Sequence, residues 1–270
     1  MSSKMHGRVA VVTGGALGIG ASTTRLFHEE GAHVVIADVN EVAGRALAAE
    51  LPGAEFRYMD VTLEQQVADA VDFAVNRFGK LDCFINNAGV IGAVGSISQT
   101  ELSHWRRTFA ILLDGVFFGM KYAARAMLKR RSGCILSTVS TAGLVGGLSA
   151  HAYTSAKHAV VGMTKSVASE MAPHGIRVNA VAPGFTVTDL AVRFFNSEEE
   201  ATRASAQDSP LGQTIQARDI AEGFLYLASD RGRNITGQIL VIDGGFIGTT
   251  APGYGNKLFH TAEPTFIGAR

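Results

Sequence analysis

Tyr153 and Lys157 are the residues of this chain whose types and spacing most directly suggest acid–base chemistry. They stand four positions apart in a segment with helical periodicity, so both side chains share one face. A lysine ammonium near a phenol favours the phenolate and lowers a tyrosine pKa of about 10 toward neutral pH. Such a tyrosine can exchange a proton with a substrate. Because a lysine four residues after a tyrosine also occurs by chance, the pair needs support from the rest of the sequence.

A hydroxyl residue stands upstream of this pair. Ser140 follows an apolar run that is typical of a strand, and its hydroxyl could hydrogen-bond a substrate oxygen and orient it. Ser137 and Thr138 are alternatives for the same role. Any of the three could instead be an ordinary turn hydroxyl at a strand end.

A glycine-rich segment, Thr13 to Gly20, lies between the first expected strand and the first expected helix. Gly14, Gly18 and Gly20 let the chain turn tightly and let a phosphate approach the backbone, while the following helix presents free N–H groups and its positive dipole end. An ordinary loop is the alternative, because glycine is common in loops. The position between a strand and a helix favours a dinucleotide site.

Asp38 ends the second expected strand, about twenty residues beyond the glycines. A carboxylate there can accept hydrogen bonds from the adenosine ribose hydroxyls and would repel a 2′-phosphate. No Arg or Lys interrupts the glycine segment, where Leu17 precedes Gly18. Both features favour NAD over NADP. The alternative is that Asp38 only caps the next helix.

These candidates need elements that place them together. Short apolar strands alternate with longer helical patterns along the chain, which predicts an α/β fold: a Rossmann-like, doubly wound parallel sheet of about seven strands with helices on both faces. Strands are expected at 8–13, 33–37, 54–59, 81–85, from 134 onward, 177–182 and 238–242, and helices at 19–31, 41–51, 63–78, 101–129, 153–171 and 217–228. One domain is expected over 1–270, with an irregular substrate-binding lobe at 185–212 and a C-terminal tail at 248–270.

Composition narrows the function classes. The 270 residues are 47% hydrophobic and 18% charged with a net charge of +0, so the chain can form a sizeable core and has no basic footprint for nucleic acid or an anionic membrane. Two cysteines without CxxC spacing, and eight histidines without a metal motif, predict no disulfide scaffold and no metal site. With neither a signal peptide nor a membrane span expected, we predict a cytoplasmic protein.

Taken in order, the motifs resemble those of the short-chain dehydrogenase/reductase family from about Gly7 to Gly245. They are Thr13 to Gly20, Asp60-Val61, Asn86-Asn87-Ala88-Gly89, Ser140, Tyr153 with Lys157, Asn179, Pro183-Gly184 and Asp243-Gly244-Gly245. Each motif alone is weak, whereas the ordered set is specific. The resemblance implies an NAD-dependent alcohol dehydrogenase.

The resemblance also implies roles for individual residues. Ser140, Tyr153 and Lys157 are the expected catalytic residues, with Tyr153 exchanging the proton and Lys157 also holding the nicotinamide ribose. Asp60 would bond the adenine amino group. The full set expected to bind the cofactor is Gly14, Leu17, Gly18, Ile19, Gly20, Asp38, Val39, Asp60, Val61, Asn87, Ala88, Gly89, Tyr153, Lys157, Pro183, Gly184, Thr186 and Thr188.

The pattern around the tyrosine resembles the branch that acts on cyclic, hydrophobic alcohols, such as terpenoid and lignan alcohols. A hydrophobic secondary alcohol or ketone is therefore the expected partner. The expected substrate pocket comprises Leu144, Val145, His151, Phe185, Phe194 and Phe195, although ordinary packing explains these apolar residues equally well. Family members are usually dimers or tetramers, and the resemblance implies a homotetramer.

One position departs from the family pattern. Leu112 stands where many members carry an asparagine that helps to hold a water linking the lysine to solvent. A leucine side chain cannot form that hydrogen bond. Three outcomes follow as alternatives: backbone carbonyls hold the water, turnover is slower, or the protein binds NAD but catalyses a non-redox cyclisation or isomerisation. A non-enzymatic NAD-binding scaffold is a further alternative, but it has no need of Ser140, Tyr153 and Lys157 together.

Overall fold

A seven-stranded parallel sheet forms the centre of the protein, in the order β3-β2-β1-β4-β5-β6-β9. The computed structural model describes residues 4–193 and 195–249. The strands are β1 Val9–Thr13, β2 His33–Asp38, β3 Glu55–Tyr58, β4 Cys83–Asn86, β5 Gly133–Thr138, β6 Ile176–Pro183 and β9 Ile239–Ile242. The predicted Rossmann-like sheet is confirmed. Its order reverses between β1 and β4, which is where ligands bind in open sheets of this kind.

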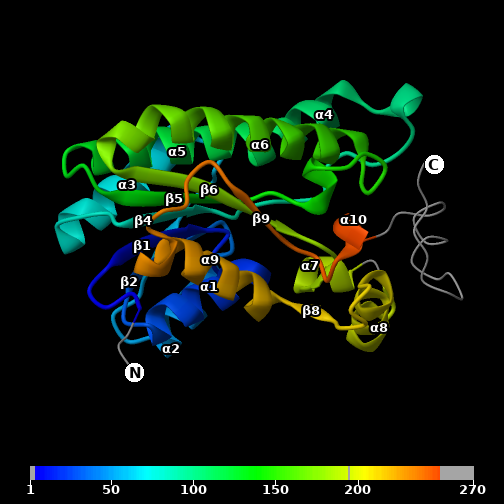
Figure 1. Cartoon of the computed structure of the whole chain (residues 1–270), viewed down its shortest axis with the longest axis horizontal. Coiled ribbons are helices and arrows are strands. Elements are labelled where there is room, and N and C mark those ends of the chain that lie inside the picture. The colour runs from blue at the N-terminus through cyan, green and yellow to red at the C-terminus, as the bar shows by residue number, and fades with distance from the viewer. Residues whose placement is uncertain (1–3, 194, 250–270) are drawn as a thin grey trace, which may run out of the picture.

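Helices cover both faces of the sheet (Figure 1). On one face lie α3 Glu64–Phe78, α5 Gly115–Leu128 and α6 His151–Met171, and on the other lie α1 Gly18–Glu29, α2 Glu41–Glu50 and α9 Ala217–Ala228. The central strands are apolar because helices cover them from both sides.

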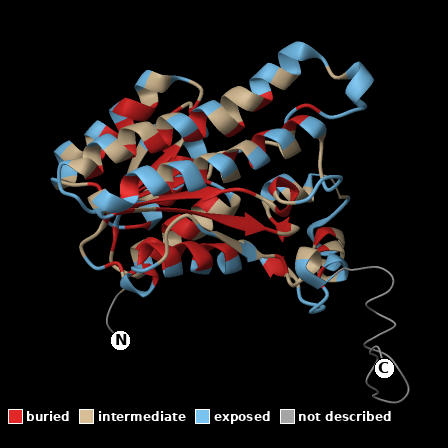
Figure 2. Cartoon of the chain, turned by 45° about the horizontal axis from the view of Figure 1, so that its top comes forward, coloured by how far each residue is buried: buried red, intermediate tan, exposed pale blue. Residues whose placement is uncertain are grey.

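The core divides into layers above and below the sheet. The larger cluster packs α3, α5 and α6 against the sheet, with Phe84 and Ile135 fully buried. The second cluster packs α1 and α9 against the opposite face, around Phe27 and Phe224. Figure 2 shows the central strands buried, whereas the edge strands β3 and β9 are partly exposed and the surrounding helices expose their outer sides. This arrangement holds the carboxyl ends of the strands rigidly along one edge.

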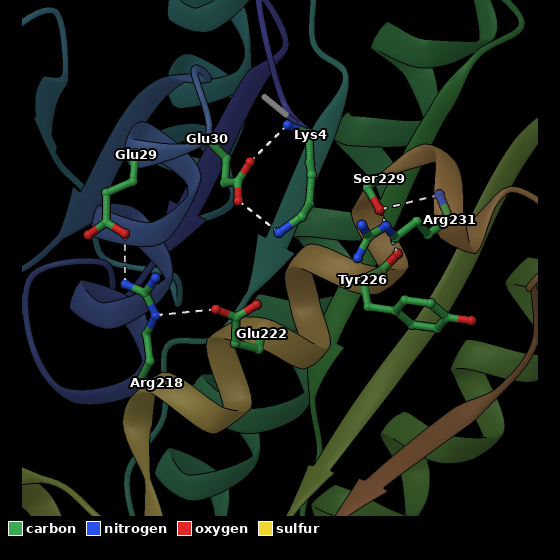
Figure 3. A network of polar contacts seen from close by, with 8 residues as sticks. All are labelled: Lys4, Glu29, Glu30, Arg218, Glu222, Tyr226, Ser229 and Arg231. Carbon is green, nitrogen blue, oxygen red and sulfur yellow. Dashed lines mark hydrogen bonds and ion pairs between the residues drawn. The ribbon is translucent and has the colours of Figure 1, made fainter. Parts of the chain in front are cut away.

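Polar contacts join the N-terminal segment, α1 and α9 at the surface (Figure 3). Lys4 pairs with Glu30 at 2.8 Å, and Arg218 of α9 pairs with Glu29 of α1 at 2.8 Å and with Glu222 at 3.4 Å. These pairs are partly exposed, so each contributes little to stability. They lie far from the residues discussed below as the site.

The structure differs from the sequence prediction in two segments. The helix expected at 101–129 comprises α4 Leu102–Phe109 and α5, joined by a π-helical stretch, η2 Ala110–Asp114. The lobe at 185–212 contains β7 Thr186–Val187, α7 Asp189–Val192 and the eleven-residue helix α8 Glu198–Asp208, which we did not predict. Its start was readable, because Ser197 caps an acidic first turn. The tail from 250 lies outside the described residues.

Several short elements complete the structure. They are η1 Ile97–Gln99, η3 Thr141–Gly143, η4 Ala172–His174, β8 Ile215–Gln216, η5 Asp230–Gly232 and α10 Phe246–Thr249. β7 and β8 form a separate two-stranded parallel pair. Figure 1 shows α7, α8 and α10 grouped at the end of the sheet where β9 finishes. The lobe therefore lies at the carboxyl edge of the sheet, where the site is expected.

Candidate active site

The glycine segment between β1 and α1 is a cradle that side chains would fill. Gly14 has a φ of +59°, and a Cβ there would lie 2.7 Å from the Ala88 Cα. A Cβ at Gly20 would collide with the Gly14 carbonyl oxygen. Gly18 also has a positive φ of +52°. The backbone conformation at Gly14 and Gly18, and the close approach at Gly20, therefore require glycine.

The N-terminus of α1 is open to an anion. Leu17 is its N-cap residue and forms no side-chain cap hydrogen bond, and the first turn holds no acidic residue. Backbone N–H groups at such an end are left for another acceptor, and the helix dipole favours a negative charge there. Together with the glycine cradle, this end fits the pyrophosphate of a dinucleotide.

Asp38 connects the glycine segment to the end of β2. Its carboxylate accepts hydrogen bonds from the Ala16 N–H at 3.0 Å and from the Asn40 N–H at 2.9 Å. The residue that caps α2 is Asn40, whose side chain accepts from the Ala43 N–H at 3.1 Å. Helix capping therefore does not explain Asp38, and its half-buried carboxylate lies beside the cradle, as a ribose-binding group must.

Asn87 ties three strands together beneath the cradle. Its amide donates to the carbonyl oxygens of Thr13 and Gly14, each at 3.1 Å, and accepts from the Thr138 hydroxyl at 3.0 Å. The Thr13 hydroxyl in turn accepts from the backbone N–H groups of Asn87 at 2.9 Å and Ala88 at 3.0 Å. These bonds fix the ends of β1, β4 and β5 relative to one another.

Ser140, Tyr153 and Lys157 come together at the end of β5. The Lys157 ammonium lies 5.5 Å from the centroid of the Tyr153 ring and donates to the Thr138 carbonyl oxygen at 2.7 Å. The Ser140 hydroxyl accepts from the Ala142 N–H at 3.1 Å, which fixes it at the start of η3. The α-helical spacing inferred from the sequence is observed, since both Tyr153 and Lys157 lie in the first two turns of α6.

The electrostatics of the pair differ from the sequence expectation. Burial raises the pKa of Tyr153, and a side-chain hydrogen bond with Ser140 opposes that rise. Burial also lowers the pKa of Lys157, to about 8. The expected lowering of the Tyr153 pKa by Lys157 is therefore not observed in this arrangement, because removal from water disfavours both charged forms more than the ammonium favours the phenolate.

A cavity of about 490 Å³ opens beside these residues. Ser140, Tyr153, Pro183, Gly184 and Thr188 line one part of it. The apolar side chains of its walls are Ile19, Ile91, Val139, Leu148, Phe185, Leu190, Ile215 and Phe246. The volume is in the range of small-molecule sites. The cavity joins the cofactor-binding edge of the sheet to the lobe.

The expected pocket residues occupy different places. Phe185 lines the cavity, and the Phe195 ring packs against it with centroids 5.4 Å apart. Leu144 is half-buried and packs against the core, whereas Val145 and His151 are exposed, and none of these three is among the described lining residues. Phe194 lies outside the described residues.

The remaining expected cofactor residues lie along the carboxyl edge of the sheet. Val39 is exposed after β2, and Val61 is buried after β3, in contact with Gly115 of α5. The Asp60 carboxylate accepts from the Thr62 N–H at 2.9 Å and hydroxyl at 2.8 Å.

Residues of the lobe approach the glycine cradle directly. Thr188 caps α7, and its side chain would contact a Cβ at Gly18 at 3.3 Å. Thr186 donates its hydroxyl proton to the Gly184 carbonyl oxygen at 3.1 Å. Gly184 follows β6 and lies so close to Asp243 that a Cβ added at Gly184 would be 2.8 Å from the Asp243 Cα. The lobe therefore begins at the cofactor side of the cavity.

Leu112 lies in the π-helical stretch and is fully buried. Its Cδ2 would lie 3.3 Å from a Cβ at Gly89, so it fills the space beside the Asn87-Ala88-Gly89 motif. π-Helical turns inside α-helices frequently occur at functional sites. The local backbone distortion is present even though the side chain is apolar.

A family model described as enoyl-(acyl carrier protein) reductase matches residues 14–247. The chain belongs to the short-chain dehydrogenase/reductase family. It is 45% identical over 258 residues to (+)-borneol dehydrogenase 2 of Salvia officinalis, covering 91% of each chain. It is 42% identical to xanthoxin dehydrogenase of Arabidopsis thaliana, again over 91% of each chain. A solved structure of ElxO with NADP bound superposes with a TM-score of 0.84 at 32% identity, covering 90% of this chain and 99% of that one.

The predicted family and enzyme class, an alcohol dehydrogenase of the short-chain type, are therefore confirmed. The family binds a nicotinamide cofactor, and the glycine cradle and the open end of α1 fit one. No helix of the described residues is long and apolar enough to cross a membrane. Within the same residues, no group of three or more His, Cys, Asp or Glu side chains could hold a metal ion.

Sequence reasoning missed three kinds of residue. The Thr13 hydroxyl and the Thr138 carbonyl organise the site, but no local pattern indicates their hydrogen-bond partners. Phe246 and Leu148 line the cavity from segments that showed no periodicity. Asp208, at the end of the unpredicted helix α8, also lines it. Only the Ser197 cap could have indicated that helix.

Proposed function

We propose that the protein oxidises a hydrophobic, cyclic secondary alcohol to a ketone with NAD. The observation that carries the proposal is the single cavity that joins Ser140 and Tyr153 to apolar walls and to the cofactor edge. The names of two similar plant proteins, borneol dehydrogenase and xanthoxin dehydrogenase, support an alcohol of terpenoid type. The cavity volume of about 490 Å³ must accommodate both the nicotinamide end of the cofactor and the substrate. This limited space favours a substrate with a compact ring system.

Each catalytic residue has a distinct task in this proposal. The Ser140 hydroxyl, at the cavity wall, orients the substrate oxygen. The Tyr153 phenol exchanges the proton of the substrate hydroxyl. Lys157, held against Thr138, holds the nicotinamide ribose and places a positive charge near the phenol. When bound, the nicotinamide ring supplies the hydride acceptor.

The raised pKa of Tyr153 favours the protonated phenol over the phenolate. A protonated phenol is the acid that ketone reduction requires. Alcohol oxidation requires the phenolate, so the phenol proton must first leave the site. The positively charged form of Lys157 favours that loss, but its lowered pKa of about 8 means that part of this help fades above pH 8.

The proposal of NAD over NADP rests on Asp38. Its carboxylate lies beside the glycine cradle, where it would repel a 2′-phosphate. The similar ElxO structure holds NADP, so the preference of this chain must be measured directly. Replacing Asp38 by Gly removes the repelling charge and should lower the ratio of kcat/KM for NAD+ over NADP+ at least tenfold, because one unfavourable charge contact is worth about 1.4 kcal/mol or more.

The decisive experiment measures NADH formation by the purified full chain from a panel of bulky cyclic secondary alcohols, with NADP+ in parallel. We expect turnover with NAD+, its loss in Tyr153→Phe, and its retention in Tyr226→Phe, which alters a partly exposed tyrosine of α9. Turnover in Tyr153→Phe equal to wild type would refute the mechanism. NAD+ titration shows whether the inactive variant still binds the cofactor.

Leu112 favours a second candidate, a non-redox cyclisation or isomerisation of a related substrate. Its apolar side chain fills the position of the family asparagine beside Gly89. Leu112→Asn distinguishes the two candidates. A faster redox rate in Leu112→Asn than in wild type would mean that the missing asparagine amide limits proton transfer. An unchanged rate would mean that backbone groups suffice to hold the water of the relay. Redox turnover absent from both proteins, with a rearranged product detected by mass spectrometry, would establish the second candidate.

We also propose a homotetramer that assembles through the α4–α5 helix and α6, in a cytoplasmic setting. Phe117 of α5 and Leu102 of α4 expose large apolar side chains, which a partner subunit could cover. Cys83 and Cys134 are free and buried, consistent with a reducing compartment. Light scattering after size exclusion tests the assembly: a monomer at working concentration contradicts it, and Phe117→Glu should reduce a tetramer to smaller species.

A further inference from the structure

The cavity carries a charge that the proposed reaction does not use. Two carboxylates line its otherwise apolar and hydroxyl-bearing wall, Asp208 and Asp243. Asp243 is buried, whereas Asp208 is exposed to water. The hydrogen-bond partners of each carboxylate decide which one is available to a ligand.

Asp243 already has partners for both oxygens. It accepts from the Gly245 N–H at 2.9 Å and from the Ile247 N–H at 2.8 Å, and so holds the turn into α10. Ser205 is also engaged, donating to the Phe185 carbonyl oxygen at 2.7 Å and accepting from the Ile215 N–H at 3.0 Å. Asp243 and Ser205 therefore already have structural partners within the fold.

Asp208 has no such partner. Among residues 4–193 and 195–249, its carboxylate forms no hydrogen bond or ion pair. It is the last residue of α8, where the helix dipole disfavours a negative charge. Its side chain is exposed to water where it lines the cavity, so the carboxylate is hydrated in the free protein and its oxygens are available to a ligand that donates a hydrogen bond.

We propose that Asp208 determines substrate specificity by accepting a hydrogen bond from a second donor group of the substrate. This inference rests on the proposed function. It deepens the substrate class to a hydrophobic ring system with the reacting secondary alcohol at Tyr153 and a second donor, a hydroxyl or a protonated amine, at the α8 side of the cavity. The apolar walls contributed by Phe185, Leu190 and Phe246 cover the ring system between the two polar ends.

The test compares matched substrates of one ring system: a mono-alcohol, the corresponding diol, and the corresponding amino alcohol. Initial rates give kcat and KM separately for wild type, Asp208→Asn, Asp208→Ala and the control Glu199→Gln, which neutralises an exposed carboxylate on the same helix away from the cavity. Titration of each ligand into the protein with NADH bound adds a readout that does not depend on turnover.

In wild type we expect the two-donor substrates to have the lower KM. Asp208→Ala should lower the kcat/KM ratio of diol to mono-alcohol about fivefold to tenfold, mainly through KM, because a hydrogen bond to a charged group is lost. Asp208→Asn keeps an acceptor but removes the charge, so it should retain part of the diol preference and lose most of any preference for the amine. Glu199→Gln should match wild type.

Different failures have different signatures. Equal kcat/KM ratios in wild type and Asp208→Ala, with turnover of all substrates, would overturn the role of Asp208 and leave the proposed function intact. The opposite failure is also recognisable. If the diol binds more tightly than the mono-alcohol, and Asp208→Ala weakens that binding, but no alcohol yields NADH, then the role of Asp208 in binding stands and the proposed redox function is overturned.

Discussion

The buried, charged ammonium of Lys157 destabilises the folded protein at neutral pH. Comparison of the free energies of unfolding of wild type and Lys157→Met measures this destabilisation. The side chain is 4% exposed, and burial lowers its pKa from 10.5 to about 8. The unfolded chain therefore holds the lysine proton more tightly than the folded protein does. The contribution of Lys157 to stability must then rise with pH between about 8 and 10.5, because this residue binds more protons in the unfolded state there.

The magnitude follows from the two pKa values. One pKa unit corresponds to about 1.36 kcal/mol, so the shift from 10.5 to about 8 gives a limit of about 3 kcal/mol above pH 10.5. Between pH 7 and pH 10 the free energy of unfolding of wild type should rise by about 2.5 kcal/mol relative to Lys157→Met. Lys157→Met also leaves the Thr138 carbonyl oxygen without its donor, a loss that does not change with pH.

Urea unfolding of the cofactor-free protein at pH 7, 8, 9 and 10 provides the assay, with fluorescence and circular dichroism as probes. Titrating groups remote from Lys157 are common to both proteins, so they cancel in the difference between the two curves, and Tyr153 stays largely protonated over this range because burial raises its pKa. Lys165→Met removes an exposed lysine of the same helix, and its curve should run parallel to that of wild type. A difference between wild type and Lys157→Met that stays constant from pH 7 to pH 10 would refute the desolvation of Lys157.

Three further outcomes are expected. The raised pKa of Tyr153 predicts that the rate of alcohol oxidation increases with pH above neutrality, up to about tenfold per unit, while ketone reduction declines; rates of both directions from pH 6 to 10 test this, and a flat oxidation profile contradicts it. Gly20→Ala places a methyl group against the Gly14 carbonyl, so it should lower the free energy of unfolding by about 1–3 kcal/mol and weaken NAD+ binding. The control Gly162→Ala, in open space on α6, should raise the free energy of unfolding by about 0.5–1 kcal/mol. Denaturant unfolding and NAD+ titration test both variants, and a Gly20→Ala protein with unchanged stability and NAD+ binding argues against the cradle. Asn87→Ala removes three bonds between strand ends and should lower the free energy of unfolding by about 2–4 kcal/mol; a loss below 1 kcal/mol would show that the strand ends hold without it.

The catalytic motif could be predicted because its geometry is local. Tyr153 and Lys157 are placed by one turn of α6, and the glycine cradle by the turn from β1 into α1. The alternation of apolar strands and helices then predicted the parallel sheet, and parallel strands bring their carboxyl ends to one edge. Asp38 was found in the same way, since it ends β2 at that edge.

Helix continuity could not be read as well. The periodicity at 101–129 indicated one uninterrupted helix, whereas the chain has a π-helical stretch at Ala110–Asp114. One extra residue in a turn changes the apolar pattern too little to be noticed locally. The stretch directs Leu112 toward Gly89, a contact between distant segments that only packing specifies.

By itself, the sequence determined the family, the order of the strand and helix segments along the chain and the residues we expect to exchange the proton, because each depends on short-range spacing and backbone conformation. The tertiary structure alone decided the environment of those residues. The pKa values of Tyr153 and Lys157 depend on how much water the surrounding segments exclude, and no local pattern encodes that. The walls of the cavity, including Asp208, come from loops and a lobe whose positions depend on contacts between segments far apart in the chain.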